Sequence, residues 1–451
     1  MGKNIQEIRD PIHNFIHFDV DEQSVIDSRP VQRLRYIHQL ALTYLTYPGT
    51  THKRFEHSLG VMELAGRVFD IITHAENIND DIRQIFPQIT DESYLRYWRK
   101  VVRIAGLVHD VGHPPFSHAA EKELFPPGFD HESMTQRLLS SSEMCNIWNN
   151  LTPPVRVNDI LKVAIGPKKL GNVDFDDWEA VMAEIITGDS FGVDRMDYLL
   201  RDSYHAGVAY GRFDHFRLIE TLRILPPPPV PPREQLIQAV LPLHEENEEE
   251  SSIEPMLGIL QGGLNAAESL LLARYFMYSQ VYFHPNRIAY NMHLLEFLKK
   301  WLPKGKFTKN PKRHLEITDN EVTTAMLTAA RTPGKKGHDA ARRIIERNHY
   351  KVVYEGNPED LTRQPDALDR LTSATQKEFG ADKVFNFEYL EKGGPHDFPV
   401  KLKDRPPASS LAVSSVLKKM PLLDVNYIFI EPSLRDVGRR WLDNNRLRIL
   451  G

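Results

Sequence analysis

The chain has little cysteine, since Cys145 is the only one among its 451 residues. A single thiol excludes an internal disulfide and a cysteine-type zinc site, and it is typical of a protein from a reducing compartment. No run approaches the ~18 consecutive apolar residues of a membrane-spanning helix, and the first residues lack the apolar core of a signal peptide. We therefore expect a cytoplasmic protein without a membrane partner.

The chain also lacks a strong excess of charge of either sign, because its formal net charge is -5. Its 41% hydrophobic and 26% charged residues are ordinary for a globular protein. This balance gives no general attraction for nucleic acid or for an anionic membrane. Basic residues do gather at 299–313 and 435–448, either as solvated surface or as anion-binding patches. Nucleic acid is thus a partner that the composition permits but does not favour.

At 451 residues the chain predicts two or three domains, or one domain with large appendages. Apolar residues repeat at helical spacing over 24–47, 51–73, 101–108, 178–187 and 256–301. Prolines at 226–232 exclude a helix, and an acidic run follows at 245–250. The strand-like runs NHYKVVYEG, DKVFNFEYL and VNYIFIE fall in the last third. We expect a mainly α protein with a core at 1–225, a linker or loop at 226–255, a helical completion of the core at 256–315 and a smaller α+β region at 316–451.

Histidines gather in one part of the chain, because eight of the nineteen fall between residues 38 and 131. The stretch VVRIAGLVHDVGHPPFSH places His109 and Asp110 at the end of an apolar helix. Gly112 and two prolines stop that helix, so His113 and His118 belong to the following turn. Buried imidazole and carboxylate groups need partners. The stretch therefore predicts a site for a cation and an anionic substrate.

A divalent metal site needs ligands that converge from separate elements. His57 lies in the first turns of the predicted helix 51–73, and His109 and Asp110 end the next one. Asp194, in GVDRMDYLLRD, lies between two apolar helices. These four residues are our predicted ligands, and the set suits Mn, Fe, Mg, Zn or Ni. Such an ion would polarise a phosphoryl oxygen or lower the pKa of a bound water, and both uses are appropriate to phosphoester hydrolysis.

The motifs RFEHSLGV, LVHDVGHPPFSH and GVDRMDYLLRD, in this order, resemble those of the HD-domain deoxynucleoside triphosphate triphosphohydrolases. The similarity runs from about residue 10 to residue 287 and implies that 1–225 is an HD-domain core. It also implies hydrolysis at the α-phosphorus to give deoxynucleoside plus tripolyphosphate. In that family the metal ligands match the four residues chosen above. The family's catalytic residues match His113, His118, Glu121 and His131.

The resemblance implies a further set of residues that contact the substrate. They are Gln39, Leu40, Arg54, Arg195, Tyr198, Asp202 and Arg274. The three arginines match phosphate-contacting positions and would supply the cations that a triphosphate leaving group needs. Gln39 and Leu40 match the pair that senses the 3′-hydroxyl and crowds out a 2′-hydroxyl. The departing 5′-oxygen needs a proton, which His118 or His131 could donate, and His113, close to Glu121 or His131, could hold an attacking water. The sequence does not assign these roles among the three histidines.

A smaller set of residues that match the same family implies regulation by a nucleotide effector. Asp27, Gln32 and Arg35 correspond to residues that hold a guanine nucleotide effector at subunit contacts in regulated members of the family. Gln6, by contrast, stands where those members place an effector-binding lysine. The resemblance therefore implies a homo-oligomer, a dimer or a tetramer, with a GTP or dNTP effector. Residues 316–451 would then have a regulatory or oligomerisation role.

Three functions fit these residues. The first is a deoxynucleoside triphosphate triphosphohydrolase, and the second is another HD-type metal phosphohydrolase such as a phosphodiesterase or a nucleotidase. The full set of Gln39, His113, His118, Tyr198 and Arg274 favours the first, because a generic HD phosphodiesterase would not be expected to share it. The third is a nucleotide- or nucleic-acid-binding sensor, which a steep fall of affinity with salt, without turnover, would indicate.

Overall fold

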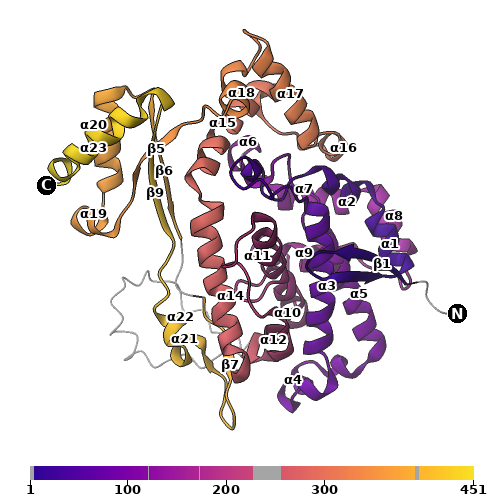
Figure 1. The fold of residues 1–451 in the computed structure, drawn as a ribbon. Helices are drawn as coiled ribbons and strands as arrows, with labels where there is room; N and C mark the ends of the chain where they lie inside the picture. The colour runs from indigo at the N-terminus through magenta and orange to yellow at the C-terminus, as the bar shows by residue number, and fades with distance from the viewer. Residues whose placement is uncertain (1–4, 120, 172, 227–254, 392–395) are drawn as a thin grey trace.

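The structure is a computed structural model that describes residues 5–119, 121–171, 173–226, 255–391 and 396–451 (Figure 1). Within these residues the chain is mainly α-helical, which confirms the predicted fold class. Two long helices, α3 (Arg54–Ile72) and α5 (Glu92–Val108), pack against each other at the centre of the first half. The other helices of this half are α1 (Val20–Ile26), α2 (Arg29–Arg33), α4 (Asp80–Ile85), α6 (Glu121–Leu124), α7 (His131–Leu139), α8 (Ser142–Asn150), α9 (Val157–Ile165), α10 (Asp177–Thr187), α11 (Val193–Ala206) and α12 (His215–Thr221).

Helix α5 shows how the sequence sets the position of the histidines. Asp91 caps its N-terminus by accepting backbone N–H groups of the first turn. The C-terminal half of the helix is buried, as its apolar spacing predicts, and His109 is the C-cap residue. Gly106 lies against α3, where a Cβ would be 3.1 Å from the carbonyl oxygen of Val61. The end of α5, and His109 with it, is therefore held close to α3.

A second long stretch, α14 (Leu264–Met277) and α15 (Pro285–Trp301), runs between the first helices and the C-terminal sheet in Figure 1. A π-helical turn at Tyr278–Tyr282 separates the two. Helix α15 packs against α18 (His338–Ile345), and α16 (Pro311–Leu315) and α17 (Asp319–Arg331) complete this group. The expected helix from residue 256 is wrong at its start. Its first residues form strand β4 (Met256–Leu260), because they pair with a strand on each side.

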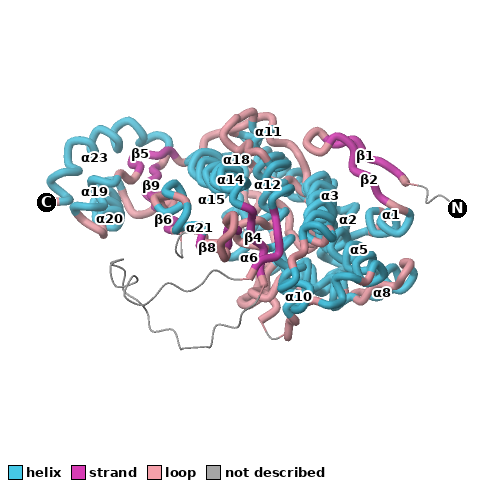
Figure 2. Tube along the Cα trace, turned by 90° about the horizontal axis from the view of Figure 1, so that it is seen from below, coloured by secondary structure: helices cyan, strands magenta, loops and turns pink. Residues whose placement is uncertain are grey.

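The described strands form three sheets. Strands β1 (Gln6–Asp10) and β2 (Asn14–Phe18) make an antiparallel hairpin. The second sheet has the order β3 (Leu222–Leu225), β4, β7 (Pro399–Lys401) and β8 (Ala408–Ser409), followed by α21 (Ser410–Val413) and α22 (Ser415–Lys418). The third has the order β5 (Lys351–Glu355), β9 (Asp424–Ile430) and β6 (Val384–Leu390), which confirms the three predicted strands. Helices α19 (Pro358–Arg363), α20 (Ala367–Phe379) and α23 (Arg435–Leu450) lie beside it, at the end of the molecule opposite the β1–β2 hairpin (Figure 2).

The expected helix over 24–47 is wrong in its extent. Helices α1 and α2 are short, and two 3-10 turns, Leu34–Tyr36 and Thr43–Leu45, follow them. Pro30 lies in the first turn of α2, but Ala41 adopts a left-handed φ of 49° that a right-handed helix excludes. His38 instead pairs with Lys53 in an isolated bridge. The segment that carries Gln39 is therefore an irregular loop fixed by tertiary contacts.

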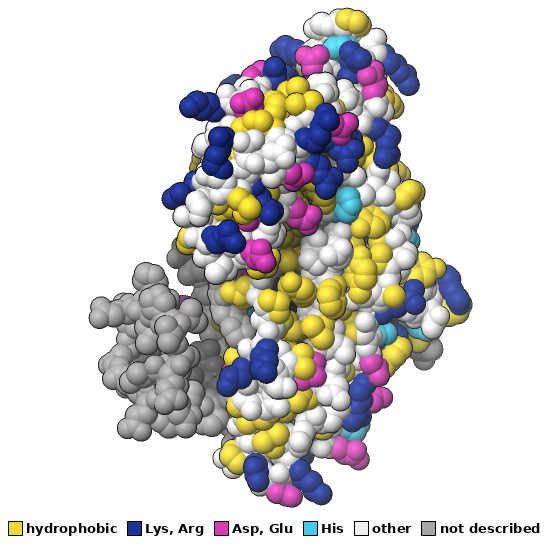
Figure 3. All heavy atoms as spheres, turned by 60° about the vertical axis from the view of Figure 1, so that its left-hand side comes forward, with side chains coloured by type: hydrophobic (Ala, Val, Ile, Leu, Met, Phe, Trp, Pro, Cys, Tyr) yellow, Lys and Arg dark blue, Asp and Glu magenta, His cyan; other side chains and the backbone are white. Residues whose placement is uncertain are grey.

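The four-part division of the chain stays a prediction, and residues 227–254 of its linker lie outside the described residues. The second sheet joins parts of the chain that are distant in sequence, because β7 pairs with β4 in parallel. Val400 of β7 also belongs to the same hydrophobic core as α3 and α5. On the face in Figure 3, apolar side chains gather across the middle, with charged side chains above and below. Among the described helices, none combines the length and apolar character needed to cross a membrane.

Candidate metal and catalytic centre

Three helices bring the predicted metal ligands together. His57 lies in the first turn of α3, His109 and Asp110 follow the last turn of α5, and Asp194 lies in the first turn of α11. Helix α3 packs against both α5 and α11. Gly60 permits the close approach of α11, because a Cβ there would lie 1.9 Å from a carboxylate oxygen on that helix. Helix packing therefore sets where the four ligands meet.

The four side chains face one another over short distances. Nε2 of His57 lies 3.0 Å from Oδ1 of Asp194 and 3.6 Å from Oδ2 of Asp110. Nε2 of His109 lies 3.4 Å from Oδ1 of Asp194 and 3.4 Å from Oδ1 of Asp110. Ligand atoms of His57, His109 and Asp194 are close enough to hold one ion. The structure thus brings His57, His109 and Asp194 to one point, and Asp110 lies beside them.

Hydrogen bonds behind both imidazoles leave their Nε2 atoms facing that point. Nδ1 of His109 lies 2.8 Å from the carbonyl oxygen of Gly106, which only accepts, so Nδ1 carries the proton. Nε2 of His109 is then a buried acceptor without a hydrogen bond to any described residue. Nδ1 of His57 lies 2.8 Å from Oδ2 of Asp197. A carbonyl or carboxylate behind each ring is the arrangement that orients metal-ligating histidines.

The electrostatics of this point favour a cation. Burial lowers the pKa of His57, but hydrogen bonds with Asp194 and Asp197 outweigh it and raise that pKa to about 10. Burial also opposes ionisation of Asp194, yet its bonds with the two histidines hold its pKa below the ordinary value. The carboxylates therefore attract positive charge more strongly than burial repels it. Two imidazoles and two carboxylates whose nitrogen and oxygen atoms face each other at 3.0 to 3.6 Å fit a divalent metal ion.

Asp197 belongs to the centre, although it is absent from the predicted set. It is fully buried, and besides His57 it contacts Nε2 of His13 at 2.7 Å. Arg201 donates two hydrogen bonds to it, at 2.8 and 2.9 Å, and a third to Asp10 at 2.8 Å. The sequence signal that could have found it is its spacing, because it lies three residues after one predicted ligand and four before Arg201 on one helix.

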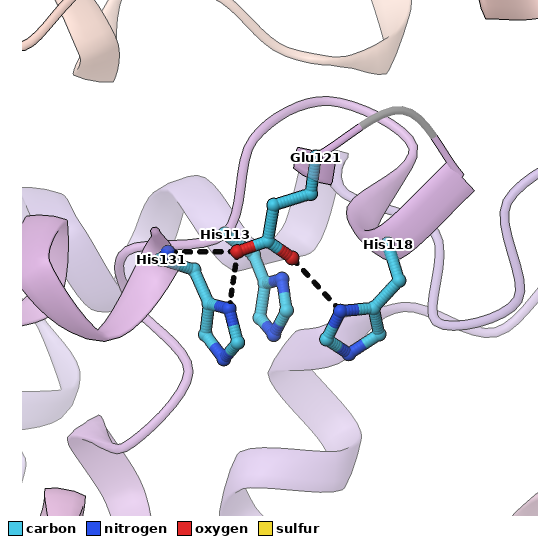
Figure 4. A group of neighbouring side chains, drawn as sticks. All are labelled: His113, His118, Glu121 and His131. Atoms are coloured by element: carbon cyan, nitrogen blue, oxygen red, sulfur yellow. Dashed lines mark hydrogen bonds and ion pairs between the residues drawn. The ribbon is translucent and has the colours of Figure 1, made fainter. Parts of the chain in front are cut away.

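A second cluster lies beside the first and is organised by Glu121 (Figure 4). One carboxylate oxygen lies 2.5 Å from Nδ1 of His131 and accepts the backbone N–H of the same residue at 2.8 Å. The other oxygen lies 2.8 Å from Nδ1 of His118. The ring of His113 stacks on that of His131, with centroids 3.9 Å apart. Nε2 of His113 is also 3.2 Å from Oδ1 of Asp110, so the two clusters touch.

The groups of this second cluster differ in charge. Burial opposes ionisation of Glu121, but its hydrogen bonds with His118 and His131 hold its pKa well below the ordinary value. Against its own burial, the pKa of His131 is raised by the bond with Glu121. Burial, with the positive charges of Arg54 and His131, lowers the pKa of His113 well below its ordinary value. Two stacked imidazoles therefore have pKa values shifted in opposite directions, upward for His131 and downward for His113.

One cavity of about 800 Å³ is lined by members of both clusters. The predicted site residues in its wall are Gln39, Leu40, Arg54, His109, Asp110, His113, His118, His131, Asp194, Tyr198 and Asp202. The rest of the wall includes one face of α15, with Ile288, Met292 and Leu295, and Phe387 of β6. A cavity of this volume with a mixed polar and apolar wall accommodates a small organic ligand.

Two charged residues of the wall are held by fixed partners. Arg54 pairs with Asp110 and donates from Nε to Oγ of Ser117 at 2.7 Å. Asp202 accepts the hydroxyl of Tyr282 at 2.7 Å, and its other oxygen lies 2.7 Å from Nε2 of His52. His52 and Tyr282 were not predicted to belong to the site. Their contacts fix side chains that face the cavity.

The remaining predicted substrate and effector residues lie outside that wall. Arg274 forms an ion pair of 2.7 Å with Glu391, and Nε and Nη1 of Arg195 are buried without a hydrogen bond to any described residue. The effector residues lie on or beside α1 and α2, where Arg35 donates to Oε1 of Gln32 at 2.9 Å. Asp27 instead accepts a hydrogen bond from Gln23 at 2.7 Å. The roles of these residues stay predictions.

Two protein families match different parts of this chain. The HD domain family matches residues 54–164, and the HD associated region matches residues 249–381. The chain is 30% identical to the uncharacterised protein YwfO of Bacillus subtilis, over 93% of this chain and 88% of that one. It is 33% identical to the human deoxynucleoside triphosphate triphosphohydrolase SAMHD1, over 48% of this chain and 36% of that one. A hypothetical protein from Aquifex aeolicus of known crystal structure has a TM-score of 0.73 and 30% identity, covering 97% of this chain and all of that one.

These matches differ in extent. The chain spans about half, or less, of the length of several curated relatives that it matches, among them the SAMHD1 proteins. It spans most of YwfO and the whole of the Aquifex structure. The HD match also contains three of the four predicted metal ligands. The chain therefore belongs to the HD-domain family, among the members that resemble the deoxynucleoside triphosphate triphosphohydrolases.

Proposed function

We propose that this protein hydrolyses deoxynucleoside triphosphates to deoxynucleosides and tripolyphosphate, with the help of a divalent metal ion. The observation that carries the proposal is the contact between the two clusters, where Nε2 of His113 lies 3.2 Å from Oδ1 of Asp110. One cluster would hold the ion and the other would move protons, and phosphoester hydrolysis needs both. Similarity to SAMHD1 proteins, whose name states this reaction, supports the choice of substrate.

The ion would be held by His57, His109, Asp110 and Asp194. When bound, a divalent ion supplies a Lewis acid for a phosphoryl oxygen and lowers the pKa of a bound water. The ligand set suits Mn, Fe, Mg, Zn and Ni alike. Asp197, from behind, fixes the ring of His57 so that its Nε2 would be free to hold the ion.

Proton transfer would fall to the cluster of Glu121. This carboxylate binds Nδ1 of both His118 and His131, so Nε2 of each ring is left for the substrate. A protonated His131, or His118, would donate a proton to the departing 5′-oxygen. His113 stays neutral, and its ring would accept a hydrogen bond from the attacking water. Glu121 would therefore act by orienting the two rings and by raising the pKa of His131.

The triphosphate and the sugar would be bound by the rest of the set. The phosphate contacts are assigned to Arg54, Arg195 and Arg274, and the sugar contacts to Gln39, Leu40, Tyr198 and Asp202. Arg54 lies in the cavity wall next to Asp110, where its charge would meet a phosphate near the ion. Arg274 would have to exchange Glu391 for a phosphate.

Regulation forms a further part of the proposal. Asp27, Gln32 and Arg35 would contact a nucleotide effector, GTP or a dNTP, at the contact between subunits of a dimer or tetramer. The hydrogen bond between Gln32 and Arg35 leaves the Arg35 guanidinium stacked over Phe55, with its carbon 3.5 Å from the ring centroid. Turnover of each dNTP with and without GTP, combined with light scattering, tests this part. Turnover that no nucleotide changes would contradict the effector.

Product analysis tests the proposed reaction. Each dNTP, alone and mixed with GTP, is incubated with Mn- or Mg-loaded protein, and tripolyphosphate is resolved from pyrophosphate and phosphate. We expect equal amounts of deoxynucleoside and tripolyphosphate, and no product with His109→Ala. Release of phosphate or pyrophosphate would indicate another HD-type phosphohydrolase. Salt-sensitive nucleotide or nucleic-acid binding without product would indicate a sensor.

A further inference from the structure

A buried carboxylate that is distant in sequence from both clusters connects two segments of the cavity wall. Asp319 is the first residue of α17 and is fully buried. One of its oxygens accepts the backbone N–H of His38 at 2.7 Å and lies 2.6 Å from Nδ1 of the same residue. Its other oxygen accepts the backbone N–H of Phe116 at 2.7 Å. Both oxygens are therefore used, and each holds a different segment.

Each of these segments contributes to the cavity wall. Gln39 and Leu40 directly follow His38, while His113 and His118 flank Phe116. Oγ of Ser117 donates to the carbonyl oxygen of His38 at 3.0 Å, which is a second link between the segments. Asp319 thus sets the distance between the loop that would bind the sugar and the loop that would move protons.

The second loop has a backbone that needs such support. Phe116 and Ser117 both adopt left-handed conformations, with φ of 58° and 55°. Side chains other than glycine persist there only where surrounding contacts hold them. Asp319 supplies the contact at Phe116, and Ser117 accepts Nε of Arg54 at 2.7 Å. Loss of the carboxylate would therefore disturb the residue that supports Arg54.

The charge of Asp319 is balanced within the same network. Nζ of Lys53 lies 2.6 Å from Nε2 of His38, so the ammonium donates to Nε2 and the Nδ1–H donates to Asp319. Arg33 reinforces the contact of α17 with the loop, because it donates to the carbonyl oxygens of Ile317, at 2.7 and 3.2 Å, and of His113, at 2.9 Å. The N-terminus of α17 is thus attached to the catalytic loop by two sets of bonds.

We propose that Asp319 is a positioning residue for the reaction, holding the His38–Leu40 and His113–His118 segments in the geometry that turnover requires. This inference rests on the proposed function. The N-terminus of α17 then serves the active site through Asp319, in addition to any regulatory or oligomerisation role of residues 316–451. Because the carboxylate touches backbone rather than substrate, its loss should impair the chemical step more than substrate binding.

The test compares Asp319→Asn with Thr318→Ala in the full-length, metal-loaded protein. The asparagine has nearly the same shape but turns an N–H donor toward one of the N–H groups that the carboxylate accepts. Thr318→Ala removes the neighbouring N-cap of α17 and leaves Asp319 in place. We expect Asp319→Asn to lower kcat roughly 10- to 100-fold with KM changed less than about threefold. Thr318→Ala should lower the Tm but keep kcat within about twofold of the wild type.

The outcomes separate the inference from the proposed function. A wild type without dNTP turnover would overturn the proposed function. An active wild type with unchanged kcat in Asp319→Asn, or with an equal loss in both variants, would overturn the inference alone. If Asp319→Asn does not fold, His38→Phe decides, because it keeps the aromatic ring and both backbone donors but removes the Nδ1–H that donates to Asp319. A loss in kcat of about threefold or more at unchanged Tm supports the inference, and an unchanged kcat overturns it.

Discussion

The two clusters use similar residue types but are built differently. The metal cluster comes from the ends of α3, α5 and α11, and the side chain of His57 is completely buried. The Glu121 cluster comes from a four-residue helix, a 3-10 turn and the first turn of α7, and the side chain of His118 is 63% exposed. Long packed helices fix the first geometry, whereas a single carboxylate holds the second. A metal site gains from rigidity, while proton transfer needs access to substrate and water.

The largest expected effect is the loss of a ligand from the metal cluster. Asp194→Asn should lower kcat/KM by at least about 10³-fold, because it removes both a ligand and a charge that draws the cation. Metal content, measured by elemental analysis after dialysis, should fall with it. Asp189→Asn is the control, since this carboxylate, 55% exposed, lies five residues earlier and pairs with Lys168. Full metal content with lost activity would place Asp194 outside the ligand set.

A smaller loss is expected from the second cluster, and without loss of metal. Glu121→Gln should lower kcat about 10²-fold, because neither His118 nor His131 keeps the carboxylate that orients it. Metal content should match that of the wild type. Glu143→Gln, an exposed carboxylate on α8, is the control and should leave both quantities unchanged. A loss of metal in Glu121→Gln would make the two clusters one site.

The same contrast explains which features could be predicted from the sequence. His57 and His109 were predictable because each lies on a helix with a clear apolar period. Gln39 was assigned to a helix, because the left-handed turn at Ala41 depends on tertiary contacts. Asp319 was missed for a stronger reason, since its partner Phe116 lies 203 residues away and no local pattern marks the pair. A helix can be predicted from the spacing of its apolar residues, whereas a contact between loops is seen only in the folded chain.

A third prediction concerns the support behind the metal cluster. Asp197→Asn should weaken metal binding roughly 10- to 100-fold, because His57 loses the carboxylate that orients its ring. Turnover should recover when the metal concentration is raised to saturation. Asp10→Asn is the control, because it weakens the pair with Arg201 and leaves the bond to His57 intact. If saturating metal fails to restore turnover, Asp197 does more than orient a ligand.

The smallest expected effect is a pH-dependent change in the free energy of unfolding. It tests whether charge holds the Glu121 cluster together. Despite burial, hydrogen bonds with His118 and His131 hold the pKa of Glu121 below the ordinary 4.5. Its contribution to stability is therefore present above pH 4.5 and lost as the pH falls through the lowered pKa. His131 has a pKa raised above 6.5 by Glu121, against its own burial, so its contribution is complete below pH 6.5 and lost as the pH rises through the raised pKa.

Both contributions are complete between pH 4.5 and pH 6.5. The difference in unfolding free energy between the wild type and Glu121→Gln should be largest in that window. It should decline by on the order of 1 kcal/mol once the pH exceeds the raised pKa of His131. Urea denaturation of both proteins across this range measures it. A difference that stays constant with pH would mean that Glu121 acts by shape and neutral hydrogen bonds alone, and the second cluster would then be fixed by packing, as the first one is.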